Sequence, residues 1–287
     1  MLKPDIIENI KHGEELNHLA GLLFNRAARE WQWGVGIQMV MGAMMVLLSE
    51  GHLNPSIKLG LVIFALSGFT LGYYLRFVSE DTFDMAETMR RQSVLSEGLG
   101  WDVNRRQFAI WKARAGTKVI NEFKHSNRPV DYWDTKASPG PRRLLELTAE
   151  SAFWAQRLYM KLRGLMWLGL VTIISAGIVV SVMSFIRHDE IEASAIVSLV
   201  FLLLPALLIF DFLDWIFKLN RVIDGIVEIE SDMEMTLADR VVTRTQVLRL
   251  VAEFNATASG GFPIHPSLYR SWHNEIKTSW EKRKKRR

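Results

Sequence analysis

The chain has 287 residues, of which 49% are hydrophobic, and it carries a formal net charge of +4. It contains no cysteine, which excludes disulfides, thiolate metal sites and a cysteine nucleophile. The hydrophobic residues are concentrated in four blocks and the rest of the chain is strongly charged, a division typical of a membrane protein whose polar segments touch anionic headgroups.

The N-terminal segment, residues 1–30, is charged from its start and lacks the apolar stretch of a cleaved signal peptide. The first uncharged run is Trp31–Ser49, and the second is Leu59–Leu75. Each has the length that a helix needs to cross a bilayer, about 17–25 residues. The short segment between them, Glu50–Lys58, makes the two helices antiparallel neighbours. Residues 31–75 are therefore predicted to form a transmembrane hairpin.

Two features inside this hairpin are candidates for packing or gating. Gly68 and Gly72 form a GxxxG pair, and small residues at this spacing let two helix backbones approach closely, either within one chain or between subunits. Gln38 places an amide inside the first run. It is a candidate pore or gating residue, although a neighbouring helix can equally satisfy a single amide.

Residues 76–163 form a polar insert that is predicted to be mostly helical. Asp81–Ser96 and Arg105–Phe123 are amphipathic. After a breaker region containing Pro and Gly, a third helix is predicted to begin at Pro141 and to continue into the next apolar run, because proline is favoured at the first helical position.

Arg142 and Arg143 lie in the first turn of this helix. Beside the free backbone N–H groups of a helix start, such cations are candidates for binding an anion such as a phosphate. The alternatives are contact with lipid headgroups or with Glu146 and Glu150.

The third uncharged run is Gly164–Ile186, and the fourth is Ala193–Phe210. The short segment Arg187–Glu192 joins them, so residues 164–217 are predicted to form a second transmembrane hairpin. Gly177 and Ser181 form a small-xxx-small pair in the third run.

Pro205 interrupts the fourth run and removes one backbone donor. The kink that it predicts is either a packing adjustment or a gating hinge.

Asp211 and Asp214 follow the fourth run three residues apart, which puts them on one helix face. Lys218 and Arg221 lie within reach. The two carboxylates are interpreted either as an interfacial charge cluster that marks the end of the span, or as part of a ring of carboxylates at a pore mouth in an oligomer.

The C-terminal segment, residues 218–287, is predicted to continue as a helix to about Phe254, with an apolar stripe that packs on the insert or forms a coiled-coil stalk between subunits. A hinge, SGGFPIHP, follows, and the chain ends in EKRKKRR. This basic tail is a candidate for attracting anionic lipid, or is simply a solvated terminus; nucleic-acid binding is a weaker alternative.

Charge predicts the orientation. Every Lys and Arg except Lys58 and Arg187 lies in the N-terminal segment, the insert or the C-terminal segment, and the positive-inside rule places these segments in the cytoplasm. Aromatic residues at the same ends of the runs are interpreted as an interfacial belt: Trp31, Trp33, Tyr73, Tyr74, Trp167 and Trp215.

Motifs of the common enzyme classes are missing: the sequence has no Walker P-loop, GxGxxG, GxSxG or HExxH. No metal site, cofactor or catalytic residue is predicted. A transporter is disfavoured because the four runs show no inverted repeat and little polar content at mid-membrane.

The predicted fold is thus all-α, with two transmembrane hairpins, a helical cytoplasmic insert and a helical C-terminal segment. This layout, an aromatic–acidic patch (Asp131, Tyr132, Trp133, Asp134) and a run before the third span together resemble the SMODS-associated four-transmembrane effectors. The run keeps an aromatic, Gln-Arg and Lys-Leu pattern, formed by Trp154, Gln156, Arg157, Lys161 and Leu162. It has Ala155 where the family suggests an acidic residue.

The resemblance implies a pore-forming or membrane-disrupting effector of bacterial antiviral defence in the inner membrane. It implies a cyclic oligonucleotide as the cytoplasmic ligand, with Arg142, Arg143 and Arg157 as candidate contacts. It also implies a homo-oligomer that works with a nucleotidyltransferase system. The alternative is a non-conducting membrane scaffold or sensor subunit that recruits a soluble partner.

Overall fold

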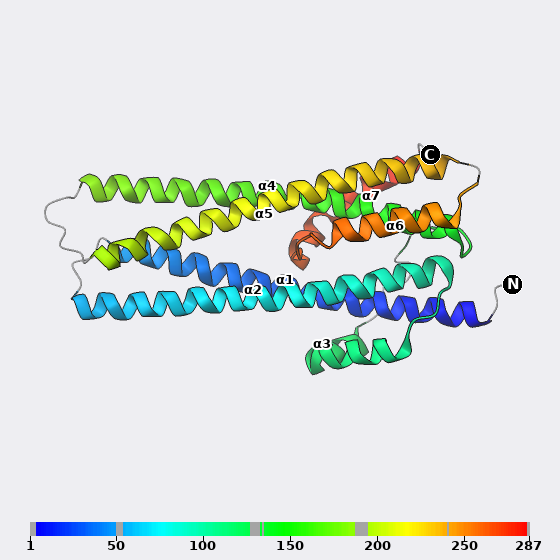
Figure 1. The fold of residues 1–287 in the computed structure, drawn as a ribbon, viewed down its shortest axis with the longest axis horizontal. Helices are drawn as coiled ribbons and strands as arrows, with labels where there is room; N and C mark the ends of the chain where they lie inside the picture. The colour runs from blue at the N-terminus through cyan, green and yellow to red at the C-terminus, as the bar shows by residue number, and fades with distance from the viewer. Residues whose placement is uncertain are drawn as a thin grey trace.

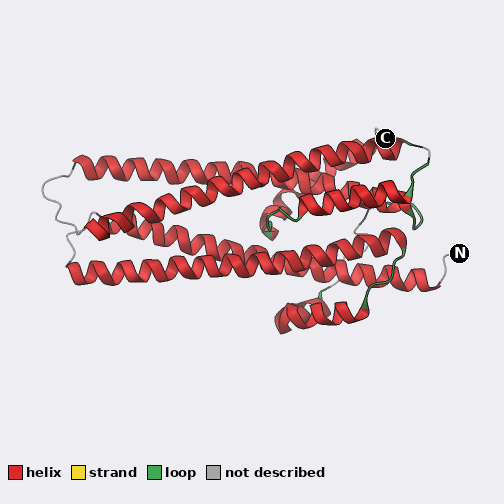
Figure 2. Ribbon diagram, in the orientation of Figure 1, coloured by secondary structure: helices red, strands yellow, loops and turns green. Residues whose placement is uncertain are grey.

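The computed structural model describes residues 4–49, 54–126, 133, 135–186, 195–239 and 241–285. Within these ranges the chain is all-helical and has no strand (Figure 2). Four helices are long: α1 (Pro4–Ser49), α2 (Pro55–Leu99), α4 (Pro141–Ile186) and α5 (Ala195–Ala238). Three are shorter: α3 (Arg105–His125), α6 (Arg244–Ala258) and α7 (Pro266–Lys284).

The long helices lie side by side along the long axis of the molecule, and the short helices pack beside only one half of them (Figure 1). α1 runs antiparallel to α2, and α4 runs antiparallel to α5. We call the half that contains only long helices the hairpin half, and the half that also contains α3, α6 and α7 the broad half. Each long helix has 44–46 residues, so it is about 66–69 Å long, more than twice the ~30 Å core of a bilayer.

Within the described ranges, two helices are long and apolar enough to cross a membrane, over Ser56–Leu99 in α2 and Pro141–Val179 in α4. The run Trp31–Ser49 is the end of α1, and the described part of the fourth run begins at Ala195 in α5. All four runs, where they are described, are therefore helical.

The helix starts follow local capping rules. α4 begins at Pro141 and continues through the third run to Ile186, as predicted. α3 begins at Arg105, also as predicted, because the Asn104 side chain accepts hydrogen bonds from the N–H groups of Arg106 and Gln107. α3 bends at Gly116, whose φ of 80° and ψ of 160° are not helical and are readily adopted only by glycine.

Two expectations about helix extent were wrong. Asp81–Ser96 is not a separate helix but the continuation of α2. The single helix expected to reach Phe254 is divided into α5 and α6. The division follows from the capping box at Thr243, where Thr243 and Gln246 satisfy each other's backbone N–H groups and start a new helix.

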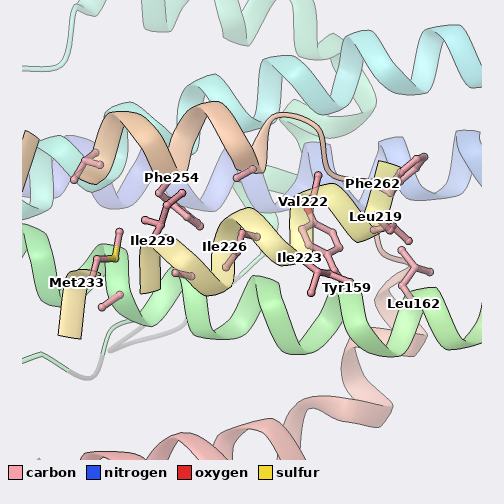
Figure 3. Close-up of a cluster of buried hydrophobic side chains, with 14 of the residues drawn as sticks. Tyr159, Leu162, Leu219, Val222, Ile223, Ile226, Ile229, Met233, Phe254 and Phe262 are labelled. Carbon is pink, nitrogen blue, oxygen red and sulfur yellow. The ribbon is translucent and has the colours of Figure 1, made fainter. Parts of the chain in front are cut away.

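The largest core lies between α4, α5 and α6 in the broad half and extends toward the hairpin half (Figure 3). The apolar stripe predicted along α5 faces this core: Leu219 and Ile226 are fully buried, and Phe254 of α6 is 1% exposed. The stripe therefore packs within the chain, and a coiled-coil stalk between subunits would need residues that are already buried.

A second core joins α1, α2 and α3. Leu19 and Leu23 of α1 and Met89 of α2 are fully buried, and Trp111 of α3 closes the cluster. Burial of apolar surface stabilises packing by about 25 cal/mol for each Å² removed from water, so these two cores hold α3 and α6 against the long helices.

Candidate functional site

A cleft of about 1040 Å³ opens in the broad half between α4, α5 and α7. We call it the charged cleft. The aromatic side chains of Phe153 and Trp280 line it, together with both cations and carboxylates. The charged residues are Lys136, Arg142, Arg157, Lys282, Arg283, Lys284, Glu146, Glu150, Glu230 and Glu234.

Arg283 ties α7 to α5 across this cleft. Its Nε lies 2.7 Å from Glu234 Oε1, and its Nη1 donates to Glu230. Glu230 and Glu234 are four residues apart, so they face the same way on α5. Glu230 is 5% exposed; burial raises its pKa, while the Arg283 guanidinium opposes that change. The buried Glu230 carboxylate is therefore stabilised in its charged form mainly by Arg283, with a smaller contribution from Arg157.

A single aromatic ring supports two of the cations. The guanidinium of Arg157 lies 5.3 Å from the centroid of Phe153, and that of Arg283 lies 5.2 Å from it. Trp280 packs on the same ring at 5.1 Å. Cations held over a ring face in this way are attracted by its quadrupole, so the two arginines are positioned side by side at the cleft.

The remaining predicted ligand contacts divide into two groups. Arg142 lines the cleft, where its Nε lies 3.4 Å from Glu146 Oε1. Arg143 does not line it: its side chain donates to the carbonyl oxygens of Glu97 at 2.9 Å and of Ala137 at 2.7 Å. Arg142 and Arg157 thus line the same cleft. Arg143 instead forms a hydrogen-bonded contact between the end of α2 and the start of α4.

A second polar group lies where the broad half meets the hairpin half. Arg76 of α2 donates from Nη1 to Asp211 Oδ2 of α5 at 2.7 Å and to Gln38 Oε1 of α1 at 3.1 Å. The Tyr73 hydroxyl donates to Asp211 at 3.0 Å, and the Arg76 guanidinium lies 4.5 Å from the Trp215 ring centroid. We call these five residues the Arg76 cluster.

The Arg76 cluster changes the interpretation of the two aspartates. Asp211 does not rely on Lys218 or Arg221; its partner is Arg76, 135 residues away in sequence. Asp214, by contrast, is exposed. The sequence analysis gave the two carboxylates the same role. Of the two, it is Asp211 that contacts the α1–α2 pair, through Arg76.

The interfacial belt is likewise divided. Trp31 and Trp215 pack on each other with ring centroids 5.0 Å apart; Trp215 is 3% exposed and therefore an interior residue, and Trp31 is half-buried against it. Trp33, Tyr74 and Trp167 are 69%, 62% and 46% exposed, as expected for the belt.

The predicted packing glycines also behave differently. A Cβ at Gly72 would lie 2.5 Å from Gln38 Cγ and 2.8 Å from the Gly34 carbonyl oxygen, and one at Gly68 would lie 2.7 Å from Met41 Cγ. No described atom outside the local helix backbone lies within 4 Å of a Cβ built at Gly177. Gly68 and Gly72 therefore sit in a tight α1–α2 seam, whereas Gly177 faces open space.

Several predicted positions lie outside the described residues. These are Asp131, Tyr132, Asp134 and the connection 187–194. The side chains of Ser181 and Pro205 also lie outside them, although α5 continues through position 205.

Sequence reasoning missed the partners that complete both groups. Arg76 carried a usable signal, because it is the first cation after the second uncharged run. Glu230 and Glu234 carried another, since acids four residues apart on a helix share one face. Arg283 was part of a run interpreted as a basic tail, and nothing local indicated that it folds back onto α5.

The two groups are connected by unbroken helix. α5 carries both Asp211 and Glu230, which are 19 residues apart in sequence, or about 28 Å along the axis. α4 carries Arg142 and Arg157 and then continues into the third uncharged run. A displacement at the charged cleft can therefore reach the hairpin half without crossing a loop.

In the part of the chain that the structure describes, no group of three or more His, Asp or Glu side chains could hold a metal ion. No protein-family model, curated protein or solved structure matches the chain.

Proposed function

We propose that the chain is a membrane effector of bacterial antiviral defence. In this proposal its cytoplasmic cleft senses a nucleotide second messenger, and its membrane helices then form a pore or disrupt the inner membrane. The observation that carries the proposal is the continuity of α4 and α5, each of which runs from the charged cleft into the apolar hairpin half.

Four spans are proposed, over the runs 31–49, 59–75, 164–186 and 193–210. The exposed surface of the hairpin half supports this assignment. Ile63, Phe64, Leu168, Ile178 and Phe210 are between 56% and 67% exposed. Apolar surface of this extent is unfavourable in water, whereas side chains that face lipid are expected to be apolar.

The proposed orientation places both chain ends and the broad half in the cytoplasm. The positive-inside rule supports it, because the two hairpin connections with their boundary residues contain only Lys58 and Arg187 among the basic residues. The basic end of α7 contacts Glu230, about 28 Å along α5 from Asp211. This distance favours a role in the charged cleft over contact with the same bilayer.

A nucleotide is proposed as the ligand because the charged cleft combines cations with aromatic rings. Arginine forks bind phosphate oxygens in a bidentate manner, and aromatic rings stack on bases. A phosphate would compete with Glu230 and Glu234 for Arg283. Its binding would weaken the contact between α7 and α5 and thus release α5 to move.

We propose that the Arg76 cluster is the contact that changes when ligand binding shifts α5. Arg76 is 9% exposed, and a buried charge that loses its partner is strongly destabilised. An axial or rotational shift of α5 would separate Asp211 from Arg76, so the helix pair is expected to switch between discrete arrangements. In an oligomer, the exposed Asp214 would be the carboxylate available to line a pore mouth.

Oligomerisation is proposed to use the exposed face of α4. Gly177 has open space beside it, and Val171 and Ile178 on the same helix are 55% and 59% exposed. Small residues on a lipid-facing helix permit close approach of a second helix. Chemical cross-linking in membranes, with Gly177→Phe as the disrupting variant, tests this assignment.

The test is ion efflux from liposomes that contain the purified full chain. The probes are 3′,3′-cyclic di-AMP, 3′,3′-cyclic GMP-AMP and cyclic tri-AMP, each added on the side that exposes the broad half. Efflux on addition of one of them is expected, and R142Q/R157Q should weaken the response at least tenfold. The matched control R106Q/K277Q removes two exposed charges elsewhere and should respond like the wild type.

Binding without efflux would instead support the non-conducting scaffold or sensor. Retention of the full response by R142Q/R157Q would contradict the assignment of the charged cleft.

A further inference from the structure

A second cleft, separate from the charged cleft, lies between α1 and α3. Its volume is about 510 Å³. Arg26, Arg29, Glu30 and Trp33 of α1 line one side, and residues 115–119 of α3 line the other. We call it the α1–α3 cleft.

The bend at Gly116 creates this cleft. The helix is interrupted there, and Arg26 Nη1 of α1 donates to the carbonyl oxygen of the preceding residue, Ala115, at 3.1 Å. Arg26 Nε lies 2.7 Å from Glu30 Oε1. Arg26 and Glu30 therefore neutralise each other and hold α3 against α1.

Two further cations remain at the cleft. Arg29 and Lys118 both line it and are exposed. Within the described ranges, neither side chain makes a hydrogen bond or an ion pair with another residue. Glu30, the single carboxylate among the lining residues, is paired with Arg26. The α1–α3 cleft thus presents two uncompensated positive charges from two different helices.

The position of the cleft along α1 identifies the source of an anion. Trp33 is 69% exposed and lies at the start of the first uncharged run, Trp31–Ser49. Arg29 is one helical turn earlier, about 6 Å along the axis. A tryptophan at the boundary of a span sits at headgroup level, so the two cations would lie in the layer of lipid phosphates.

The geometry points to a binding site for the phosphate of an anionic phospholipid headgroup, formed by Arg29 and Lys118 and bordered by Trp33. This inference rests on the membrane insertion proposed above. A bound headgroup would join α3 to α1 at the membrane surface. It would thereby fix the bend of α3 beside the helix pair that anchors the molecule.

The experiment measures the thermal stability of the full chain in a zwitterionic detergent as a soluble lipid is added. The probes are dihexanoyl phosphatidylglycerol, dihexanoyl phosphatidylcholine and inorganic phosphate. Saturable stabilisation by phosphatidylglycerol alone is expected. R29Q/K118Q should weaken its apparent affinity by roughly 30-fold, from about fivefold for each cation near a headgroup.

Two control variants keep the result interpretable. R106Q/K277Q removes two exposed cations at other sites and should leave the affinity unchanged, whereas R29K/K118R keeps both charges and should retain most of it. An equal loss in R106Q/K277Q would show general electrostatic attraction and overturn the site. Equal stabilisation by inorganic phosphate at matched concentration would identify a free anion as the ligand and overturn the lipid.

Carbonate extraction of membranes separates this inference from the proposed function. If the wild-type chain stays in the membrane but shows no response to phosphatidylglycerol, only the lipid site fails. If the chain is extracted, membrane insertion fails, and the lipid site fails with it.

Discussion

The α1–α2 pair and the α4–α5 pair have nearly the same length but are held together in different ways. In the first pair, Gly34 and Gly72 bring two backbones together, and a Cβ at Gly34 would lie 2.7 Å from the Gly72 carbonyl oxygen. In the second pair, a Cβ at Gly169 would meet the ring of Phe212 at 2.8 Å. Backbone contact leaves no space to adjust, whereas a ring can change its rotamer.

The pairs also differ in what surrounds them. The charged cleft opens on α4 and α5, while α1 and α2 contribute no lining residue to it. The Arg76 cluster joins the pairs at one level, through Arg76 on one side and Asp211 on the other. Under the proposed function, this difference favours the first pair as the fixed support and the second as the pair that moves. Four measurements can break or sharpen this assignment.

The largest effect is expected at the contact between the pairs. Asp211→Asn leaves the Arg76 guanidinium buried without an opposite charge, which should destabilise the chain by about 3–5 kcal/mol. Asp214→Asn changes an exposed carboxylate and should stay within about 0.5 kcal/mol of the wild type. Reversible unfolding in mixed micelles measures both. Similar effects of the two substitutions would show that Asp211 does not join the pairs.

The next effect concerns the far end of the fixed pair, where Glu97 of α2 is 3% exposed. Burial raises the pKa of Glu97 to about 7, with Glu14 adding to the rise, and with Ser93, Trp133 and Arg143 opposing it. The ordinary value is 4.5, so between these two values the folded chain holds a proton that the unfolded chain has lost. Stability should therefore be highest below pH 4.5, fall as the pH rises to about 7, and then level off.

The slope from this group should reach at most about 1.4 kcal/mol per pH unit. Glu97→Gln removes this pH dependence. The unfolding free energy of the variant minus that of the wild type should therefore increase from pH 5 to pH 7. Melting curves at half-unit steps of pH measure it. A difference that stays constant over this range would show that Glu97 is already ionised when folded.

A smaller effect compares a glycine in the α1–α2 seam with a glycine of α4 that faces open space. Gly72→Ala places a methyl group against Gln38 and the Gly34 carbonyl and should cost about 1–3 kcal/mol. Gly177→Ala meets no described side chain and should stabilise α4 by up to about 1 kcal/mol, because alanine has the higher helix propensity. Unfolding in micelles again provides the measurement. Opposite signs support the comparison, and a loss in both variants contradicts it.

Local rules predicted much of the fold. The uncharged runs, the proline at position 141 and the amphipathic pattern after Arg105 identified helices that the structure contains. Continuity was harder to predict: Asp81–Ser96 has the composition of a surface helix, and only its packing on α1 and α3 shows that it continues α2. The break near Thr243 was missed although Thr243 and Gln246 form a recognisable capping box.

The candidate sites depended on contacts between distant residues. Arg142 and Arg157 were selected by motif and resemblance, but the cleft between them is completed by Arg283, 126 positions after Arg157 in the sequence. Asp211 was selected as a membrane-edge carboxylate, yet its partner was assigned to its own helix. A sequence pattern predicts on which face of a helix a charged residue lies. Its partner on another helix can be identified only once the packing of the helices is known.

The smallest effect is expected at Thr243, the N-cap residue of α6. Thr243→Ala removes the hydroxyl of the capping box and should cost about 1 kcal/mol, while Thr243→Ser should retain nearly all of it. Because α6 packs on α4 and α5 through residues such as Val247 and Phe254, amide hydrogen exchange should accelerate in α6 and not in α3. Equal acceleration in α3 would show that the two pairs respond as one body, and the division into a fixed and a movable pair would be wrong.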